Sequence, residues 1–137
     1  MPTYEWAVLR VVPRVERGEF VNVGVVLHCK ALDYLGCEIS DDLSRAQALD
    51  PGRDVEGVRA HLDAIADVCS GAAAAGDSGQ RSKGDRFRWL VAPRSTVVQP
   101  SPVHAGISDD PARELDALAA RMVAGPTADG SAARSPG

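Results

Sequence analysis

The sequence has 137 residues and a formal net charge of −4, with 45% hydrophobic, 25% charged and 4% aromatic residues. This length predicts a domain of ordinary size that needs no disulfide or metal to fold. The acidic balance argues against a surface dedicated to nucleic acid. No apolar run reaches the roughly 20 residues of a membrane span, and the first ten residues lack the basic lead of a secretory signal. We therefore expect a cytoplasmic protein without a membrane partner.

The first third of the chain predicts an antiparallel sheet begun by an N-terminal hairpin. Residues 4–12 are rich in β-branched and aromatic side chains and end at Pro13, which predicts a strand. Residues 20–29 predict a second strand, whose first half places Val21, Val23 and Val25 on one face. The short charged segment between them, PRVERGE, is typical of a hairpin loop. Residues 33–39 predict a third, shorter strand.

Three segments predict helices. Residues 41–49 predict a short helix capped by one of two aspartates, at 41 or 42. Residues 55–70 predict a longer one, because apolar side chains recur at spacings of three and four between a capping Asp54 and a terminating Gly71. A third begins at an Asp-Pro pair, residues 110–111, and ends before Gly125.

The remaining segments complete the predicted architecture. Residues 71–85, rich in Gly and Ser, predict a mobile connection. Residues 86–98 predict one or two strands, with Pro93 at an edge or a bulge. The polar tail, 125–137, predicts disorder. We expect a single α+β domain over residues 1–124, with an antiparallel sheet packed against two main helices.

An arginine in the first strand is the main candidate for a binding site. If the hairpin is centred near Glu16, antiparallel pairing places Arg10 opposite Asn22, and Val8 opposite Gly24. A half-buried guanidinium needs an anionic partner, which a glutamate at 16, 19 or 38 could supply, or a bound phosphate or carboxylate. Gly24 could relieve crowding against a side chain such as that of Trp6, or could let a ligand approach. Structural pairing is the commoner explanation of such a set, and ligand binding stays open.

For two further groups of charged residues we also compare a structural explanation with a binding role. Four residues of alternating sign crowd the hairpin loop, and they form either a solvated loop or a recognition loop: Arg14, Glu16, Arg17 and Glu19. Residues 80–94 are basic and contain Phe87 and Trp89, which could stack on single-stranded nucleic acid. The alternation of these aromatics instead favours an ordinary half-buried strand.

The sequence contains no signature of a cofactor, a metal or a common reaction. The three cysteines, at 29, 37 and 69, have neither the spacing of a zinc site nor an even number, and we expect buried free thiols. The histidines at 28, 61 and 104 form no metal-binding pair. No nucleophile elbow, phosphate-binding loop or dinucleotide fingerprint occurs, which leans against an enzyme.

The chain resembles a known family in two segments and in the helix after the Asp-Pro pair. The segments are VVPRVERGEFVNVGVVL and RWLVAPRSTVVQPSPVHAG. The resemblance is to the bacterial domain of unknown function family 3037 and covers about residues 3–124. The family motif corresponds here to Pro13, Glu16, Gly18, Glu19, Asn22, Gly24, Pro93, Ser95 and Gln99. The resemblance implies a small α+β domain, specifies no reaction, and implies an accessory role beside a HipA-like kinase encoded nearby.

The family motif also suggests that the segment RSTVVQ lies against the hairpin. Arg94, Ser95 and Gln99 would then join Arg10 and Asn22 in an anion-binding or peptide-binding groove. Our leading hypothesis is a non-enzymatic interaction module for a partner protein. The alternative is a small-molecule or nucleotide-binding protein, or an enzyme, with a polar anion site made by Arg10, Glu19, Asn22 and Arg94. A homodimer through an unpaired strand edge near Pro93 is a further expectation.

Overall fold

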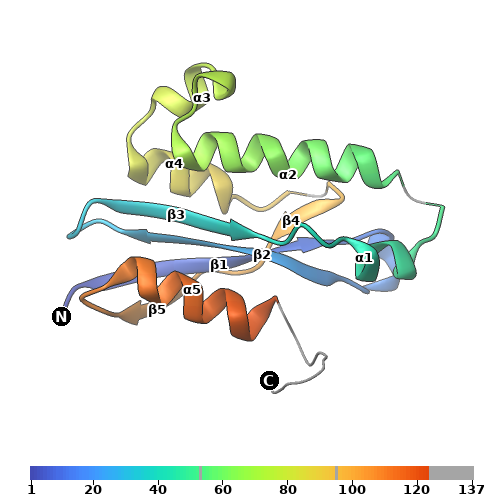
Figure 1. Ribbon diagram of the computed structural model, residues 1–137, viewed down its shortest axis with the longest axis horizontal. Helices are drawn as coiled ribbons and strands as arrows, with labels where there is room; N and C mark the ends of the chain where they lie inside the picture. The colour runs from blue at the N-terminus through green and yellow to red at the C-terminus, as the bar shows by residue number, and fades with distance from the viewer. Residues whose placement is uncertain (53, 95, 124–137) are drawn as a thin grey trace.

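The computed structural model describes residues 1–52, 54–94 and 96–123, and it has the predicted α+β fold (Figure 1). One antiparallel five-stranded sheet forms the centre. Strand β1 (Thr3–Val11) pairs with β2 (Val21–Cys29) on one side, and β3 (Tyr34–Ile39) pairs with β2 at the edge. On its other side β1 pairs with two short strands in turn, β5 (His104–Ile107) and β4 (Val98–Pro100).

Helices cover both faces of this sheet. On one face lie α2 (Val55–Ser70) and α4 (Lys83–Leu90), with α3 (Asp77–Gln80) between them along the chain; α5 (Pro111–Met122) lies on the opposite face (Figure 1). The short α1 (Ser44–Leu49) follows β3, and single turns of 3-10 helix occur at Val15–Arg17 and Ala73–Ala75. No helix in the described part of the chain is long and apolar enough to cross a membrane.

A β-bulge sets the register of the first hairpin. Arg10 pairs with Asn22 as predicted, but Gly24 pairs with Leu9 and not with Val8, so β2 contains one extra residue at this point. A bulge of this kind bends the strand and moves the following side chains to the other face. The predicted pair of Val8 with Gly24 is therefore wrong.

The bulge divides the valines of β2 between two cores. Val21 and Val23 pack in the core between the sheet and α2, whereas Val25 and Leu27 pack against α5. The predicted common face for Val21, Val23 and Val25 is wrong for this reason. Because β2 supplies apolar side chains to both faces, it is buried on both sides, as the central strand of a three-layer arrangement must be.

The segment predicted as a mobile connection and a strand forms helices instead. The hydroxyl of Ser82 accepts a hydrogen bond from the backbone N of Asp85, which caps α4. Phe87 is 3% exposed and faces the core with Leu90, one helical turn on, whereas Trp89 is 44% exposed. The two aromatics are two positions apart in a helix, so their alternation does not indicate a strand. Strand β5 was not predicted.

The other predicted helix ends agree with the structure in part. Asp54 and Gly71 flank α2 as predicted, and Gly71 has the left-handed conformation, with φ of 76°. Asp110 accepts a hydrogen bond from the backbone N of Arg113 and caps α5. The short helix begins only at Ser44, whose backbone N donates to the carboxylate of Asp42. The predicted disordered tail, 125–137, lies outside the described residues.

A serine between β4 and β5 forms hydrogen bonds with the middle of strand β1. The hydroxyl of Ser101 accepts a hydrogen bond from the backbone N of Val8 at 2.9 Å, and the backbone N of Ser101 donates to the carbonyl of Val8 at 2.8 Å. These two bonds occupy the gap between the two short partner strands. The edge of β1 is therefore hydrogen-bonded along nearly its whole length.

Gly24 is required by the close approach of β3. A Cβ atom at this position would lie 2.9 Å from the carbonyl oxygen of Glu38 and 3.1 Å from Cγ1 of Ile39. We expect Gly24→Ala to lower the free energy of unfolding by about 1–3 kcal/mol, because backbone must move to admit the methyl group. Urea denaturation measures the change.

Gly84→Ala is the matched control for this prediction. A Cβ atom there would meet only side-chain atoms at 3.7 Å or more, inside the first turn of α4. The control should change the free energy of unfolding by less than about 1 kcal/mol, toward higher stability. Equal losses in the two variants would contradict the explanation.

Two acids meet where β3 lies beside α5. The carboxyl groups of Glu38 and Asp116 share a hydrogen bond, which raises the pKa of Glu38. A group whose pKa is raised by folding stabilises the fold when protonated, and this contribution is lost as the pH rises through the raised pKa. Glu38→Gln keeps a donor at every pH. It should raise the free energy of unfolding at pH 7 by roughly 0.2–0.5 kcal/mol, since the pair is exposed, and should change it less at pH 4.

Candidate functional site

Arg10 lies at the centre of the sheet, on the face that carries α5. Its neighbours across the strands are Asn22 in β2 and Gln99 in β4. The guanidinium carbon lies 4.2 Å from the centroid of the Phe20 ring, which makes a cation–π contact. The chain after α4 therefore brings Gln99 beside Arg10 and Asn22, as the sequence predicted.

The polar atoms of this group are only partly satisfied. Asn22 donates from Nδ2 to the carbonyl of Met122, at the end of α5, at 2.9 Å. Its Oδ1 is buried without a hydrogen-bond partner among the described residues, and so is Nε of Arg10. Burial of polar groups without partners is costly, so a donor and an acceptor left open side by side require an explanation.

The acids predicted as internal partners of Arg10 form no ion pair with it among the described residues. Glu19 pairs with Arg17 at 3.0 Å, and Glu38 shares a hydrogen bond with Asp116. Within residues 1–52, 54–94 and 96–123, no ion pair involves Arg10. Arg10 is thus a half-buried cation on a rigid strand without a carboxylate, which leaves its charge available to an external anion.

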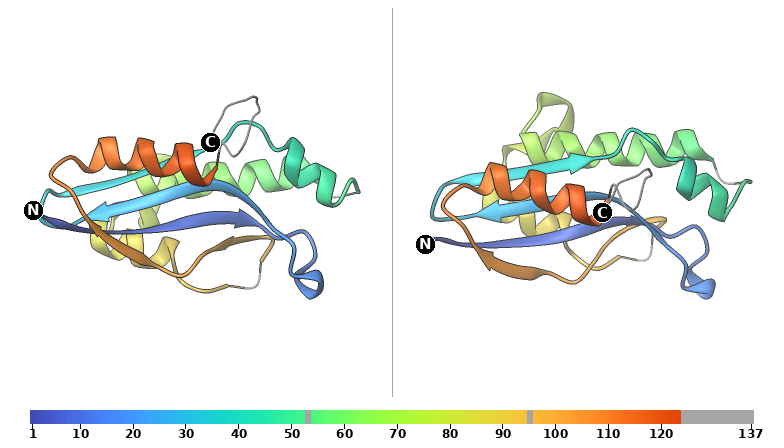
Figure 2. Two further views of the ribbon diagram at one scale, coloured as in Figure 1. Left: turned by 90° about the horizontal axis from the view of Figure 1, so that it is seen from below. Right: turned by 60° about the horizontal axis from the view of Figure 1, so that its bottom comes forward.

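The surface around Arg10 is aromatic. Phe20 is 46% exposed, and half-buried Trp6 on the same face of β1 stacks against exposed His104 in β5 with ring centroids 4.7 Å apart. Helix α5 packs mainly on β2 and β3 and also buries Tyr4 of β1, while β5 and the hairpin end of β1 lie beside it (Figure 2). We name this open surface the β1 face: Trp6, Arg10, Phe20, Asn22, Gln99 and His104.

The charged hairpin loop pairs largely with its own surroundings. Arg17 holds Glu19, and Arg14 lies 3.9 Å from a carboxylate oxygen of Asp50. Arg14, Glu16, Arg17 and Glu19 are all exposed. No hydrogen bond or ion pair among the described residues joins these four side chains to Arg10; the loop reaches the β1 face through Phe20 at its end.

Arg94 and Gly24 do not belong to the β1 face. The guanidinium of Arg94 stacks on Trp89 at 4.8 Å and donates to the carbonyls of Trp89 and Ala92, so it closes the C-terminal end of α4. This places Arg94 in the helical layer on the other side of the sheet. Gly24 pairs with Leu9 on that same side, and Ser95 lies outside the described residues. The strand edge predicted at Pro93 is also wrong, because Pro93 follows α4 and is in no strand, and the homodimer stays a prediction.

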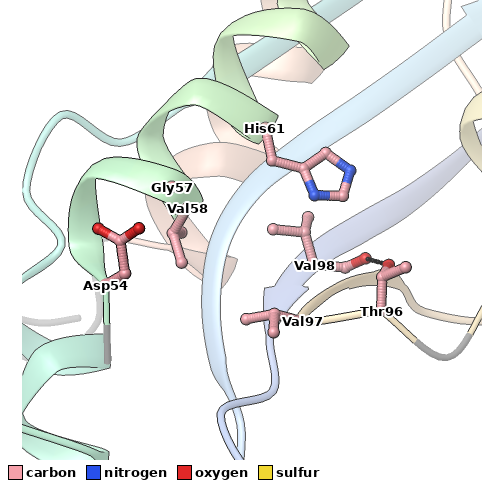
Figure 3. A pocket seen from close by; sticks show the side chains of 7 residues that line it. All are labelled: Asp54, Gly57, Val58, His61, Thr96, Val97 and Val98. Atoms are coloured by element: carbon pink, nitrogen blue, oxygen red, sulfur yellow. Dashed lines mark hydrogen bonds between the residues drawn. The ribbon is translucent and has the colours of Figure 1, made fainter. Parts of the chain in front are cut away.

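A hollow of about 470 Å³ separates the start of α2 from β4 (Figure 3). His61 projects over Val98, while Asp54 lies at the opposite end of the hollow. The hydroxyl of Thr96 donates to the carbonyl of Val98 at 2.7 Å, and burial lowers the pKa of His61. Among the described residues no hydrogen bond joins His61, Thr96 and Asp54, so these groups are not linked in the way that a nucleophile and its base are.

Two cations of the basic stretch at 80–94 pair with neighbouring acids. Lys83 lies 3.3 Å from a carboxylate oxygen of Asp33, and Arg88 pairs with Asp85. Phe87 is in the core, where it stacks with His28, and a guanidinium lies over the ring of Trp89. The two aromatics therefore do not form an exposed pair of stacking rings. The described residues contain no cluster of three potential metal ligands.

Fold and site together define a small α+β protein with an unpaired arginine on an open, aromatic sheet face. The family described as "Protein of unknown function (DUF3037)" matches residues 6–123, so the chain belongs to this family. No curated protein and no solved structure matches the chain. The family description names no reaction, and any function must be argued from the site itself.

Sequence reasoning missed the aromatic part of the β1 face. Phe20 lies diagonal to Arg10 across the hairpin, and diagonal neighbours of this kind are within reach of long side chains. That offset was available from the predicted pairing. The contact of Trp6 with His104 was not, because it depends on β5, a strand that the sequence does not predict.

Arg10 should be dispensable for stability. Arg10→Met removes an unpaired, half-buried charge and keeps much of the side-chain volume, so the free energy of unfolding should stay unchanged or rise by up to about 1 kcal/mol. Arg59→Met is the matched control, because Arg59 is also half-buried but donates to the carbonyl of Ser40 at 3.2 Å and pairs with Asp41. The control should lose about 1 kcal/mol in urea denaturation. A larger loss for Arg10→Met than for Arg59→Met would show that Arg10 is structural.

Proposed function

We propose that this protein is a non-enzymatic interaction module that binds an acidic segment of a partner protein on its β1 face. Arg10 is the charged anchor of this surface. The observation that carries the proposal is its half-buried guanidinium, which has no carboxylate among the described residues and whose Nε has no hydrogen-bond partner there. A HipA-like kinase, the partner that the family resemblance implies, is the first candidate.

The composition of the β1 face supports a protein partner. Arginine and large aromatic side chains carry most of the binding energy in protein interfaces, and here Arg10 lies between Phe20 and Trp6 on one strand face. A strand pinned on both edges presents these groups with little loss of conformational freedom on binding. The surface is therefore prepared for association.

The charge of Arg10 suggests the chemistry of the bound segment. Its guanidinium is half-buried and can donate to a carboxylate oxygen from its terminal N–H groups, whereas its Nε and Oδ1 of Asn22 are buried. A peptide with an acidic side chain would supply the missing negative charge. Trp6 and Phe20 would then flank the peptide as apolar contacts.

A small anionic ligand at the same atoms is the second candidate. A free amino acid also presents a carboxylate, and the guanidinium without an acidic partner favours it for the same reason. The hollows described for this structure are lined neither by Arg10 nor by Asn22, so a small ligand would find little enclosure there. Small-molecule sites usually bury most of their ligand, which favours the peptide.

Co-expression of the tagged protein with its chromosomal neighbours, followed by native mass measurement, tests the proposal. We expect a stoichiometric complex with the unaltered chain, and at least a tenfold loss of affinity for Arg10→Met, because the partner carboxylate would remain buried and unpaired. Arg17→Met removes an exposed charge from the hairpin loop and is the matched control, with a change of less than about threefold.

Two results would contradict the interaction module. A complex that Arg10→Met retains at full affinity would place the interface elsewhere. Failure to recover any partner, combined with thermal stabilisation by free amino acids that Arg10→Met abolishes, would instead support the small anionic ligand. A bound ligand at a hundredfold excess over Kd should add about 2.7 kcal/mol to the stability.

A further inference from the structure

Two of the three cysteines meet on the face of the sheet opposite to the β1 face. Cys37 lies in β3, and Cys69 lies in the last turn of α2, which packs on that strand. Both side chains belong to the core between α2 and the sheet. Their thiols form a hydrogen bond with each other, and neither is in a disulfide. The pair is formed by residues 32 positions apart, and the alternation of β3 and the period of α2 bring them together.

The two thiols differ in access to solvent. Cys69 is only 4% exposed, whereas Cys37 is half-buried. Cys37 lines a surface hollow of about 250 Å³ with Leu62 and Ala66 of α2 and two acids, Asp41 and Asp63. A small molecule can therefore reach Cys37 from solvent, and Cys69 lies behind it.

A buried cation accompanies the pair. Arg86 of α4 is 8% exposed, donates from Nη1 to the carbonyl of Gly79 at 3.2 Å, and has an Nε without a partner among the described residues. Its charge acts on Cys69. This charge opposes, without outweighing, the raised pKa of Cys69, and it favours the thiolate in which that sulfur would attack in a second step.

The hydrogen bond assigns different roles to the two sulfurs. The contact with Cys69 lowers the pKa of the Cys37 thiol, and the contact with Cys37 together with burial raises that of Cys69. The accessible sulfur is thus the one that ionises more readily. This is the order needed when an exposed thiolate reacts first and a buried thiol follows.

We propose that Cys37 and Cys69 are a thiol oxidation site that a small neutral hydroperoxide converts to a reversible intramolecular disulfide. The thiolate of Cys37 attacks one peroxide oxygen, an S–O bond forms, the O–O bond breaks, and the departing alkoxide takes a proton from water. The sulfur of Cys69 then attacks that of Cys37. An S–S bond forms, the S–O bond breaks, and hydroxide leaves with the Cys69 proton as water. Two thiols and one hydroperoxide give one disulfide, one alcohol and one water.

The acids of the hollow favour this class of oxidant over glutathione disulfide. Asp41 and Asp63 line the entrance to Cys37, and only Asp41 has a cationic neighbour there, Arg59 at 4.0 Å. An anionic tripeptide disulfide meets charge repulsion and a small opening, whereas a neutral hydroperoxide meets neither. The site does not depend on the proposed function of the β1 face.

Mass spectrometry of the full chain after treatment with hydrogen peroxide and quenching with iodoacetamide tests the proposal. We expect an intact chain lighter by two hydrogens, one alkylated cysteine, and a proteolytic fragment that joins Cys37 to Cys69. Dithiothreitol should reverse the change. Cys29→Ser is the matched control and should form the same disulfide, because Cys29 lies in the other core and donates to the carbonyl of Thr3 at 3.6 Å.

Single variants separate the two steps. Cys69→Ser should stop at a sulfenic acid on Cys37 that dimedone traps, and Cys37→Ser should resist peroxide at concentrations that oxidise the unaltered chain. Asp63→Asn should raise the rate with glutathione disulfide about two- to fivefold at low salt, by removing a nearby negative charge. A circular dichroism spectrum shows that each variant is folded.

Several results would overturn the proposal. One is a folded chain that stays reduced in peroxide while the urea-unfolded chain is oxidised. Others are a disulfide that includes Cys29 or joins two chains, or dimedone trapping on Cys69 in preference to Cys37. An unchanged rate for Asp63→Asn would remove the argument for a neutral oxidant.

Discussion

The bulge in β2 is the constraint on which the other features of this structure depend. Without the extra residue, strict alternation would place Asn22, Gly24 and Val26 on one face, and Val21, Val23 and Val25 on the other. The insertion lets one strand supply valines to α2 before the bulge and to α5 after it. It also leaves Asn22 on the face of α5, where it holds the end of that helix. Both helical layers thus depend on one irregular residue.

The same irregularity separates the β1 face from the apolar core under α5. Toward the hairpin loop Arg10 and Asn22 belong to the β1 face, and further along β2 the helix covers Val25 and Leu27. A helix that extended further would bury Arg10 without a carboxylate, which is costly. The end of α5 at Met122 therefore coincides with the start of the polar surface.

The sequence predicted the elements whose signals are local and strong. The first three strands, α2 and α5 carry clear periodicity or unambiguous caps, and the structure confirms them within a few residues. The helix at 83–90 was missed because an eight-residue segment with two alternating aromatics fits the two-residue period of a strand as well as the period of a helix. Its capping box, Ser82 to Asp85, was the signal that could have decided between them.

The candidate site could be predicted where it depends on one hairpin and not where it depends on the whole fold. Arg10 opposite Asn22 follows from pairing alone, and the family motif brought Gln99 to them. The predicted position of Arg94 beside Arg10 was wrong because local contacts with Trp89, five residues earlier in the chain, decide where its side chain lies. The bulge itself could not be predicted, because a run of valines is compatible with burial on either face of the sheet and so does not fix the register.

The serine between β4 and β5 has a consequence for how the molecule can open. Because Ser101 completes the hydrogen bonding of β1 between its two short partners, this strand has a neighbour on each edge for most of its length. Local fluctuations release strands from an edge, and β1 has no free edge to start from. We therefore expect the amide protons of β1 to exchange with solvent among the slowest in the molecule, which places Arg10 in a region of high local stability.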